Sequence, residues 1–547
     1  MSVHRIMGIE TEYGILKLGD AYANPMLMSS QIVLAYRDLA RMRRGTRWDY
    51  VDESPLRDAR GFELSRASAH PSLLTDDPAR PAPSGETGGD AVKTAASPVP
   101  DYGLRVVDEV RPEREPYDDP GAANVVLTNG ARLYVDHAHP EYSSPEVTNP
   151  RDAVLWDRAG ELVMAAGAVE ASRLTGTEMV VYKNNVDGKG ASYGTHENYL
   201  VDREVPFEDI VAALTTFFVT RNILIGSGRV GLGPRGEEAG FQISQRADYM
   251  EAEVGLETTM RRPIINTRDE PHADRDRWRR LHVIIGDANT FDFATYLKLG
   301  ATACVLWAIE LSQEYPDFQT RLTSLRLADP VADVQRVSRD VSLSATLALS
   351  DGRRLTAAQI QYEYISVVRD LYSRVGEPDP ESEALLAAWS ETLDGLVQDP
   401  YSVAHRVEWV AKLQVLSRLK EREHLDWDSP RLAAVDLQWS DMREGRGISA
   451  KLRQAGAVAT LTDPAEVRRA VAEPPEDTRA YFRGRVLTKF SESVVTASWD
   501  TMTLDVPELP ALSRIPMLDP ARGTKDLIGA LIEEAATIGD LVRTLAR

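Results

Sequence analysis

Three short segments of the sequence place acids, an imidazole and a phenol at alternating positions. Glu10 and Glu12 are separated by one residue, as are Tyr134 and Asp136, and His196 lies in a further segment that alternates polar and apolar residues. In a β-strand, residues i and i+2 project from the same face of the sheet. We therefore expect these carboxylates, the imidazole and the phenol to share the faces of neighbouring strands.

Paired carboxylates of this kind indicate a divalent cation. Two carboxylates roughly 4–7 Å apart repel each other by about 2–4 kcal/mol at an effective dielectric constant of about 20, a cost that a cation offsets. Oxygen ligands with few imidazoles and no thiolate favour Mg²⁺ or Mn²⁺ over Zn²⁺, and Mg²⁺ often completes its shell with nucleotide phosphates. For any single pair the alternative is a solvated sheet face. The repeated choice of acids, imidazole and phenol over Thr, Lys or Ser favours the metal site.

Donors that suit phosphate oxygens occur on other expected strands. Arg246 and Arg268 each lie in an alternating polar pattern, and His282 interrupts an apolar run. Guanidinium and imidazole groups bind phosphate through charge-assisted hydrogen bonds. We expect these three side chains to face the phosphates of a nucleotide.

Two glycine-rich segments match known motifs but lack the structural context that those motifs need. Residues 226–231 fit the dinucleotide fingerprint, yet they neither follow a clear strand nor open a helix. Residues 190–194 resemble a nucleophile elbow, but the residues after them alternate like a strand. The sequence has no Walker A motif and no His-Glu-x-x-His motif. A nucleotide would therefore have to bind on a sheet.

Composition excludes several classes of protein. The 547 residues include 63 Lys and Arg against 84 Asp and Glu, a net charge of −21, which argues against binding to nucleic acid or to anionic lipid. The single cysteine, Cys304, excludes disulfides and cysteine zinc sites within one chain. No segment approaches about 18 uninterrupted apolar residues, and the acidic N-terminal segment does not resemble a signal peptide. We expect a cytoplasmic protein without a membrane span.

Hydrophobic periodicity predicts an α+β protein with a largely antiparallel sheet. Strands are expected at residues 3–13, 131–136, 179–185, 192–201, 240–249, 263–268 and 280–285. Helices are expected at residues 29–43, from Asn149 as N-cap and Pro150 as first helical residue, and at 207–221, 291–314, 357–375 and 408–422.

The domain organisation is expected to be one large unit and one small one. We assign residues 1–460 to the catalytic domain and residues 475–547 to a small C-terminal domain, because the composition near 463–475 turns to Asp, Pro and Glu. Residues 45–121 are expected to be a long inserted loop. Its part from 75 to 120, rich in Pro, Gly, Ala and Ser, is predicted to be disordered.

Several motifs in order resemble the Pup ligase/depupylase family across nearly the whole chain. They are GIETEYG at 8–14, NGARLYVDHAHPEYS at 129–143, YKNNVDGKGASYG at 182–194, GFQISQRADY at 240–249, INTRDEPHAD at 265–274, RLHVIIGDAN at 280–289 and DTRAYFRG at 477–484. The resemblance implies a glutamine-synthetase-like fold. A curved antiparallel sheet would cradle ATP and Mg²⁺, covered by an outer layer of helices and joined to a small C-terminal domain.

The family contains two opposite activities, and the segment 47–66 favours one of them. This segment is similar to a loop that the deamidase/depupylase members have and the ligases lack. The resemblance therefore implies an ATP- and Mg²⁺-dependent hydrolase that deamidates the C-terminal glutamine of the small modifier Pup and removes Pup from pupylated proteins, with a functional link to the bacterial proteasome. The alternative is an ATP-consuming Pup–protein ligase of the same fold.

The resemblance also implies roles for individual residues. Asp136 would be the catalytic carboxylate, either attacking the carbonyl or activating water, and Arg246 would stabilise the oxyanion. ATP, or ADP plus phosphate, would meet Arg268, His282 and Arg483. Two Mg²⁺ would be bound by Glu10, Glu12, Tyr134, Glu141 and His196. Four structural alternatives stay open: Tyr134 as a packing aromatic, Arg268 paired with Asp269 or Glu270, Trp48 as a loop anchor, and Arg483 with Arg479 as a bridge between domains.

Overall fold

A six-stranded antiparallel sheet lies at the centre of the computed structural model, which describes residues 2–20, 22–42, 46–66, 69, 73, 103–110 and 123–546. Every neighbouring pair of its strands is antiparallel. In spatial order the strands are β16 (Trp278–Val283), β11 (Thr195–Asp202), β1 (Met7–Glu12), β9 (His139–Ser143), β8 (Arg132–Asp136) and β7 (Asn124–Val126). The predicted antiparallel sheet is confirmed.

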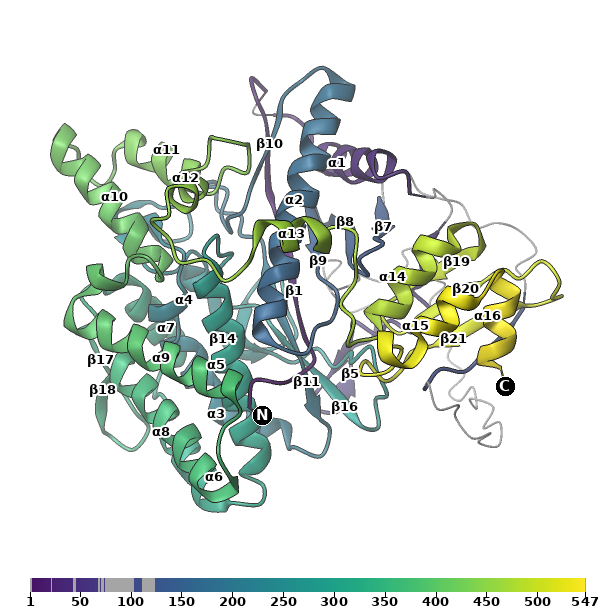
Figure 1. Cartoon of the computed structure of the whole chain (residues 1–547). Coiled ribbons are helices and arrows are strands. Elements are labelled where there is room, and N and C mark those ends of the chain that lie inside the picture. Colours follow the sequence, from purple (N-terminus) through teal and green to yellow (C-terminus); the bar gives the residue numbers. More distant parts are fainter. Residues whose placement is uncertain are drawn as a thin grey trace.

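Two long helices cover one face of this sheet (Figure 1). The helix α2 (Pro150–Thr175) begins as predicted, because the side chain of Asn149 accepts a hydrogen bond from the backbone of Asp152 and Pro150 is the first helical residue. It packs on α1 (Pro25–Leu39) and on β1 and β9. At Gly160 there is no room for a side chain, because the ring of Tyr142 lies against the helix backbone. The apolar face of the sheet is thereby closed, and its polar face remains for a site.

A helical body adjoins the sheet and holds the largest hydrophobic core (Figure 1). The ring of Phe217 packs edge-on against Tyr364 and Trp389 within it. Its helices are α3 (Phe207–Thr220), α4 (Asn222–Ile225), α5 (Asp292–Leu311), α6 (Pro316–Ser324), α7 (Pro330–Arg339), α8 (Ala357–Val375), α9 (Pro380–Gln398), α10 (Glu408–Glu423), α11 (Pro430–Trp439) and α12 (Ile448–Gln454). The short helix α13 (Pro464–Ala470) packs on α2. Among the described residues, α5 is the one helix long and apolar enough to cross a membrane. However, 78% of that apolar window is buried inside the structure, as in the core helix of a soluble protein.

Short strand pairs surround the main sheet. They are β2 (Gly14–Lys17) with β10 (Met179–Tyr182), β4 (Arg57–Asp58) with β5 (Phe62–Glu63), β12 (Arg229–Leu232) with β13 (Glu238–Gln242), β14 (Met250–Gly255) with β15 (Arg262–Asn266), and β17 (Thr346–Ala348) with β18 (Arg354–Thr356). The glycine-rich segment 226–231 leads into β12 and opens no helix, in agreement with the rejection of a dinucleotide fingerprint.

One predicted strand is too long. The segment 240–249 leaves the strand after Gln242, and Ala247–Tyr249 form a short 3-10 helix. The backbone N–H groups of Gln245 and Arg246 donate to the Asp287 carboxylate, at 2.9 Å and 3.3 Å, instead of to a neighbouring strand. A carboxylate distant in sequence therefore accepts the backbone hydrogen bonds that a neighbouring strand would otherwise accept.

The C-terminal unit is a five-stranded sheet, and two of its strands come from the inserted segment. The central strands are β19 (Val494–Ala497), β20 (Thr501–Leu504) and β21 (Leu512–Pro516), and the edges are β3 (Arg47–Trp48) and β6 (Val107–Glu109). The helices α14 (Ala480–Lys489), α15 (Lys525–Glu534) and α16 (Ile538–Leu545) pack with this sheet around one core. Trp48 and Leu104 belong to that core. The C-terminal unit therefore contains, besides residues from 475–547, two strands from the inserted segment.

The predicted disorder of residues 75–120 falls mostly outside the described residues. Residues 103–110 are described and hold β6.

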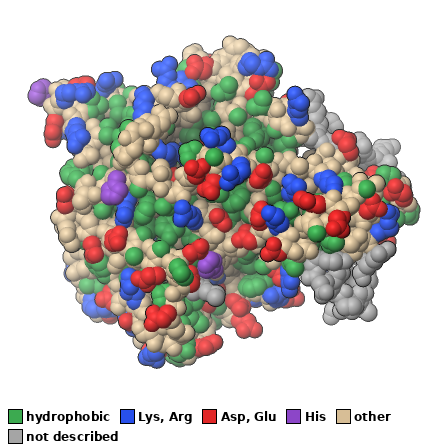
Figure 2. Space-filling view, in the orientation of Figure 1, with side chains coloured by type: hydrophobic (Ala, Val, Ile, Leu, Met, Phe, Trp, Pro, Cys, Tyr) green, Lys and Arg blue, Asp and Glu red, His purple; other side chains and the backbone are tan. Residues whose placement is uncertain are grey.

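Figure 2 shows acidic and basic side chains intermixed over one face of the molecule, without a large region of one sign.

Candidate active site and metal centre

The register of the central sheet aligns the polar side chains predicted from alternation. Because directly opposed residues of antiparallel strands project from the same face, each pair brings two functional groups together. The pairs are Glu10 opposite His196, Glu12 opposite Glu141, Tyr134 opposite Glu141, and Asn198 opposite His282. The predicted metal ligands thus form one continuous row across the strands.

Two groups of side chains in this row are spaced for metal ions. Glu10, His196 and His282 form one group, and in each group the ligand atoms lie within 4.8 Å of one another. Glu12, Asp136 and Glu141 form the other. Nδ1 of His196 lies 3.4 Å from Oε2 of Glu10. Asp136 and His282, which were expected to serve catalysis and phosphate binding, therefore lie where they can also bind a metal ion.

The second group carries the signs of a cation site. Oε2 of Glu141 is buried and has no hydrogen-bond partner, which is unusual for a carboxylate oxygen. Burial, together with the charges of Asp136, Glu10 and Glu12, raises the pKa of Glu141 well above its usual value. A divalent cation among these oxygens removes both costs. The residues fit a metal with oxygen ligands such as Mg²⁺.

Two other carboxylates of the site are held in the ionised form. Burial raises the pKa of Glu10, but the hydrogen bond from His196 and the charge of Arg280 outweigh it and leave the pKa below its usual value. Burial likewise raises the pKa of Asp136, and the hydrogen bond and charge of His137 bring it below its usual value. Both groups are therefore carboxylates at neutral pH.

His282 is kept neutral and oriented. Burial, with the charges of Arg280 and His196, lowers its pKa well below the usual value. Its Nδ1 lies 2.9 Å from Oδ1 of Asn198 on the next strand. A neutral imidazole fixed by such a partner is a suitable metal ligand.

Arg268 has a free guanidinium edge directed at the pocket. Its side chain is 9% exposed, and its Nε and one Nη are buried without hydrogen-bond partners. The expected alternative partners are engaged elsewhere: Asp269 accepts from Arg203 at 2.7 Å, and Glu270 accepts from the backbone of Ser54 at 2.5 Å. Buried unsatisfied donors on a cation fit an anion such as phosphate.

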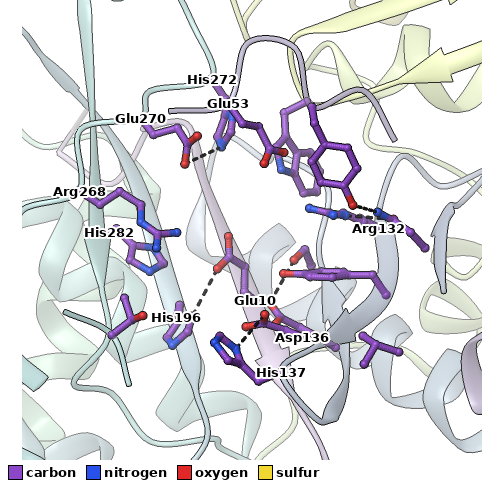
Figure 3. Close-up of a pocket in the computed structure, with 18 of the residues that line it drawn as sticks. Glu10, Glu53, Arg132, Asp136, His137, His196, Arg268, Glu270, His272 and His282 are labelled. Atoms are coloured by element: carbon purple, nitrogen blue, oxygen red, sulfur yellow. Dashed lines mark hydrogen bonds and ion pairs between the residues drawn. The ribbon is translucent and has the colours of Figure 1, made fainter. Parts of the chain in front are cut away.

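A pocket joins these groups (Figure 3). It has a volume of about 880 Å³ including its open mouth. The predicted residues that line it are Glu10, Tyr134, Asp136, Glu141, His196, Arg268 and His282. Sequence reasoning missed six further acidic, basic or imidazole side chains of the lining, namely Glu53, Arg132, His137, Glu270, His272 and Arg280. Arg280 lies two residues before His282 on β16, so the same alternation could have found it.

Three predicted residues do not line this pocket, namely Glu12, Arg246 and Arg483. Glu12 still belongs to the second group of possible metal ligands. The guanidinium of Arg246 is fully buried and donates to the carbonyl of Ile284 at 2.8 Å and to Oγ of Ser192 at 3.2 Å. Burial and the charge of Arg262 lower its pKa to about 9. Arg483 donates to Glu146 at 2.5 Å and to the carbonyl of Gly130 at 2.7 Å. Arg483 thus forms a bridge between the C-terminal unit and the central sheet, and the predicted roles of both arginines stay predictions.

The segment 47–66 reaches the pocket and contacts the row of candidate metal ligands. Tyr50 and Glu53 line the pocket, and Nε1 of Trp48 donates to Oε1 of Glu53 at 2.6 Å. The guanidinium of Arg132 lies 3.9 Å from the ring centroids of both Trp48 and Tyr134. Trp48 therefore anchors its segment, and Tyr134 packs in a cation–π stack while its strand also faces Glu141.

The family described as Pup-ligase protein matches residues 5–503 of the chain. The chain belongs to the Pup ligase/depupylase family. The Pup deamidase/depupylase of Mycobacterium tuberculosis (strain ATCC 25618 / H37Rv) is 49% identical to it over 546 residues, which cover 99% of each protein. The predicted family is confirmed, and so is the prediction that the chain resembles its deamidase/depupylase members more than its ligases.

Two solved structures of the family resemble this fold. The complex between Pup and its ligase PafA has a TM-score of 0.73 and 28% identity, covering 97% of this chain and 92% of that one. The Pup ligase PafA in complex with ADP has a TM-score of 0.67 and 33% identity, covering 76% of this chain and 90% of that one. The predicted α+β class is confirmed.

Proposed function

We propose that this protein deamidates the C-terminal glutamine of Pup to glutamate and cleaves the isopeptide bond between Pup and a substrate lysine. The observation that carries this conclusion is the 49% identity over 99% of the chain to a Pup deamidase/depupylase, against 40% over 68% of the chain to a Pup–protein ligase. Its partners are Pup and pupylated proteins in the cytoplasm, with a functional link to the bacterial proteasome.

Two Mg²⁺ ions are the metal cofactors of this proposal. Glu10, His196 and His282 would hold one, and Glu12, Asp136 and Glu141 the other, as the spacing of their ligand atoms and the unpartnered oxygen of Glu141 support. Mg²⁺ supplies Lewis-acid polarisation of carbonyl and phosphate oxygens when bound.

ATP, or ADP plus phosphate, is the nucleotide cofactor. The unpartnered donors of Arg268 would bind its phosphates. A second, more apolar pocket adjoins the first, sharing Glu10, Ser143, His272, Arg280 and Trp499. A phosphate end near the acids and a base end in the apolar pocket match the two halves of a nucleotide, and the ADP complex of the ligase PafA supports this use of the fold.

Asp136 would act on the scissile carbonyl. Its lowered pKa keeps it ionised, so it can either attack the γ-carbonyl of the glutamyl side chain or take a proton from an attacking water. In both cases one water is consumed and the C–N bond breaks. The nitrogen leaves as ammonia in deamidation and as the lysine amine in isopeptide cleavage.

The proposal is tested with purified protein, Mg²⁺, ATP and glutamine-ended Pup. Conversion of Pup to the glutamate form, followed by mass spectrometry, together with release of Pup from a conjugate, is expected without stoichiometric loss of ATP. Unchanged Pup, or one ATP spent for each event, would favour the ligase alternative, which the likeness to the two PafA structures keeps as the second candidate.

A further inference from the structure

His137 occupies an unusual backbone position beside the site. Asp136, the last residue of β8, pairs with His139, the first residue of β9, so His137 and Ala138 form a two-residue turn. The backbone of His137 has a φ of 52°, in the left-handed region where such turns favour glycine or asparagine. Oγ of Ser29 on α1 holds the turn by donating to the carbonyl of Ala138 at 2.8 Å. A strained histidine at a pocket points to a role for its side chain.

The left-handed backbone brings the ring back to its neighbour. Adjacent residues of a continuous strand project to opposite faces, yet Nδ1 of His137 lies 2.9 Å from Oδ1 of Asp136 (Figure 3). The His137 side chain is 39% exposed and the Asp136 side chain 24% exposed. The turn therefore gives Asp136 a hydrogen-bond partner that its own strand cannot provide.

We propose that His137 is a positioning residue that fixes the rotation of the Asp136 carboxylate. This inference rests on the proposed function. The terminal torsion of an aspartate is broad and roughly two-fold, so a carboxylate without a partner presents either oxygen to the site. With Oδ1 held by His137, the other oxygen would stay available to a metal shared with Glu12 and Glu141, whose ligand atoms lie within 4.8 Å of one of Asp136, or to the reacting carbonyl. Partners of this kind typically change activity by about 10–100-fold when removed.

A second histidine provides a matched control for the backbone. His424 ends α10 with the same φ of 52°, and it lies at a helix C-cap, where the left-handed conformation is common. It does not line the pocket. Substitutions at His424 therefore show the effect of changing a residue with a left-handed backbone conformation, without any change in the pocket.

The test compares His137→Asn, His137→Gly and His137→Ala with His424→Asn and His424→Gly. The amide nitrogen of asparagine is as many bonds from Cα as Nδ1 of histidine, and asparagine tolerates positive φ. We expect His137→Asn to keep near wild-type turnover of glutamine-ended Pup. We expect His137→Gly to lower kcat by about 10–100-fold, with KM for Pup, affinity for ADP and Tm maintained. His137→Ala removes the same hydrogen-bond donor, and it replaces His137→Gly in the comparison if the glycine variant does not fold.

Three results would overturn the inference while the wild type converts Pup. They are a wild-type kcat in His137→Gly, an asparagine variant as slow as the glycine variant, and a similar loss of kcat in His424→Gly. A wild-type enzyme that leaves Pup unchanged would instead refute the proposed function.

Discussion

Glu10 and His196 face each other across β1 and β11, with Nδ1 of the imidazole 3.4 Å from Oε2 of the carboxylate. Neither residue lies near the other in sequence. Antiparallel pairing places them on one face of the sheet, and His282 from β16 completes the group. The grouping of these candidate metal ligands is thus a property of strand pairing.

Replacement of Glu141 by glutamine should reveal the cation through stability. A carboxyl group whose pKa is raised in the folded state makes its full contribution to folding stability at pH values below its unfolded pKa. That contribution is lost as pH rises through the folded pKa. At neutral pH the metal-free wild type therefore carries a destabilising acid, which Mg²⁺ relieves. We expect Mg²⁺ to raise the Tm of the wild type more than that of Glu141→Gln, measured calorimetrically with EDTA as reference. An equal Mg²⁺ response of the two proteins would contradict the assignment.

Replacement of Asp136 by asparagine should separate chemistry from binding. The amide can neither attack nor accept a proton, so conversion of glutamine-ended Pup should fall by at least about 100-fold. Because Arg268 and the adjoining pocket are untouched, the Kd for ADP measured without Mg²⁺ should stay close to that of the wild type. Single-turnover mass spectrometry of Pup and calorimetric titration of ADP measure the two quantities. A variant that works at the wild-type rate would remove Asp136 from the central role.

Replacement of Arg268 by methionine should weaken nucleotide binding. A hydrogen bond to a charged group contributes about 1.5–3 kcal/mol, which corresponds to roughly a 10–100-fold increase in Kd for ADP. The control is Arg326→Met, at an arginine that is 60% exposed and pairs with Glu253 at 3.8 Å. Equal ADP affinity in both variants would show that Arg268 does not meet the phosphates.

Glu146 should contribute a pH-dependent part of the stability. Burial raises its pKa, but the charges of Arg483 and Arg479 outweigh it and lower the pKa from 4.5 to about 2. A carboxylate with a lowered pKa stabilises the folded protein at pH values above its unfolded pKa. This contribution, about 3 kcal/mol in total, is lost as pH falls from about 4.5 toward 2. We expect Glu146→Gln to be less stable than the wild type at pH 7, by roughly 3–5 kcal/mol because two buried arginines lose their partner.

Denaturant unfolding at several pH values measures this contribution. The difference between the wild type and Glu146→Gln should shrink as pH falls below about 4.5. The control is Glu170→Gln, which removes an exposed pair with Arg173 and should change stability by at most about 1 kcal/mol. A difference that is constant with pH would exclude Glu146 as its source.

Much of the site could be predicted from the sequence because its residues alternate on strands. Glu10 with Glu12, and Tyr134 with Asp136, lie on the faces that period-2 alternation indicates, and the α+β class follows from the same pattern. Motifs at fixed spacing identified the family, and local N-cap chemistry predicted the start of α2 at Pro150. These are local properties, which the sequence determines by itself.

Only the tertiary structure decided which groups act together. Pairing register, which depends on long-range contacts, placed Asp136 and His282 beside the candidate metal ligands and directed Arg483 to Glu146. Ser338 and then the Asp287 carboxylate accept from the backbone after Gln242, where the strand expected at residues 240–249 ends. The edges of the C-terminal sheet recruited β3 and β6 from the insert. Sequence spacing carries no record of such partners, because each is chosen by backbone hydrogen bonds and burial between segments far apart in the chain.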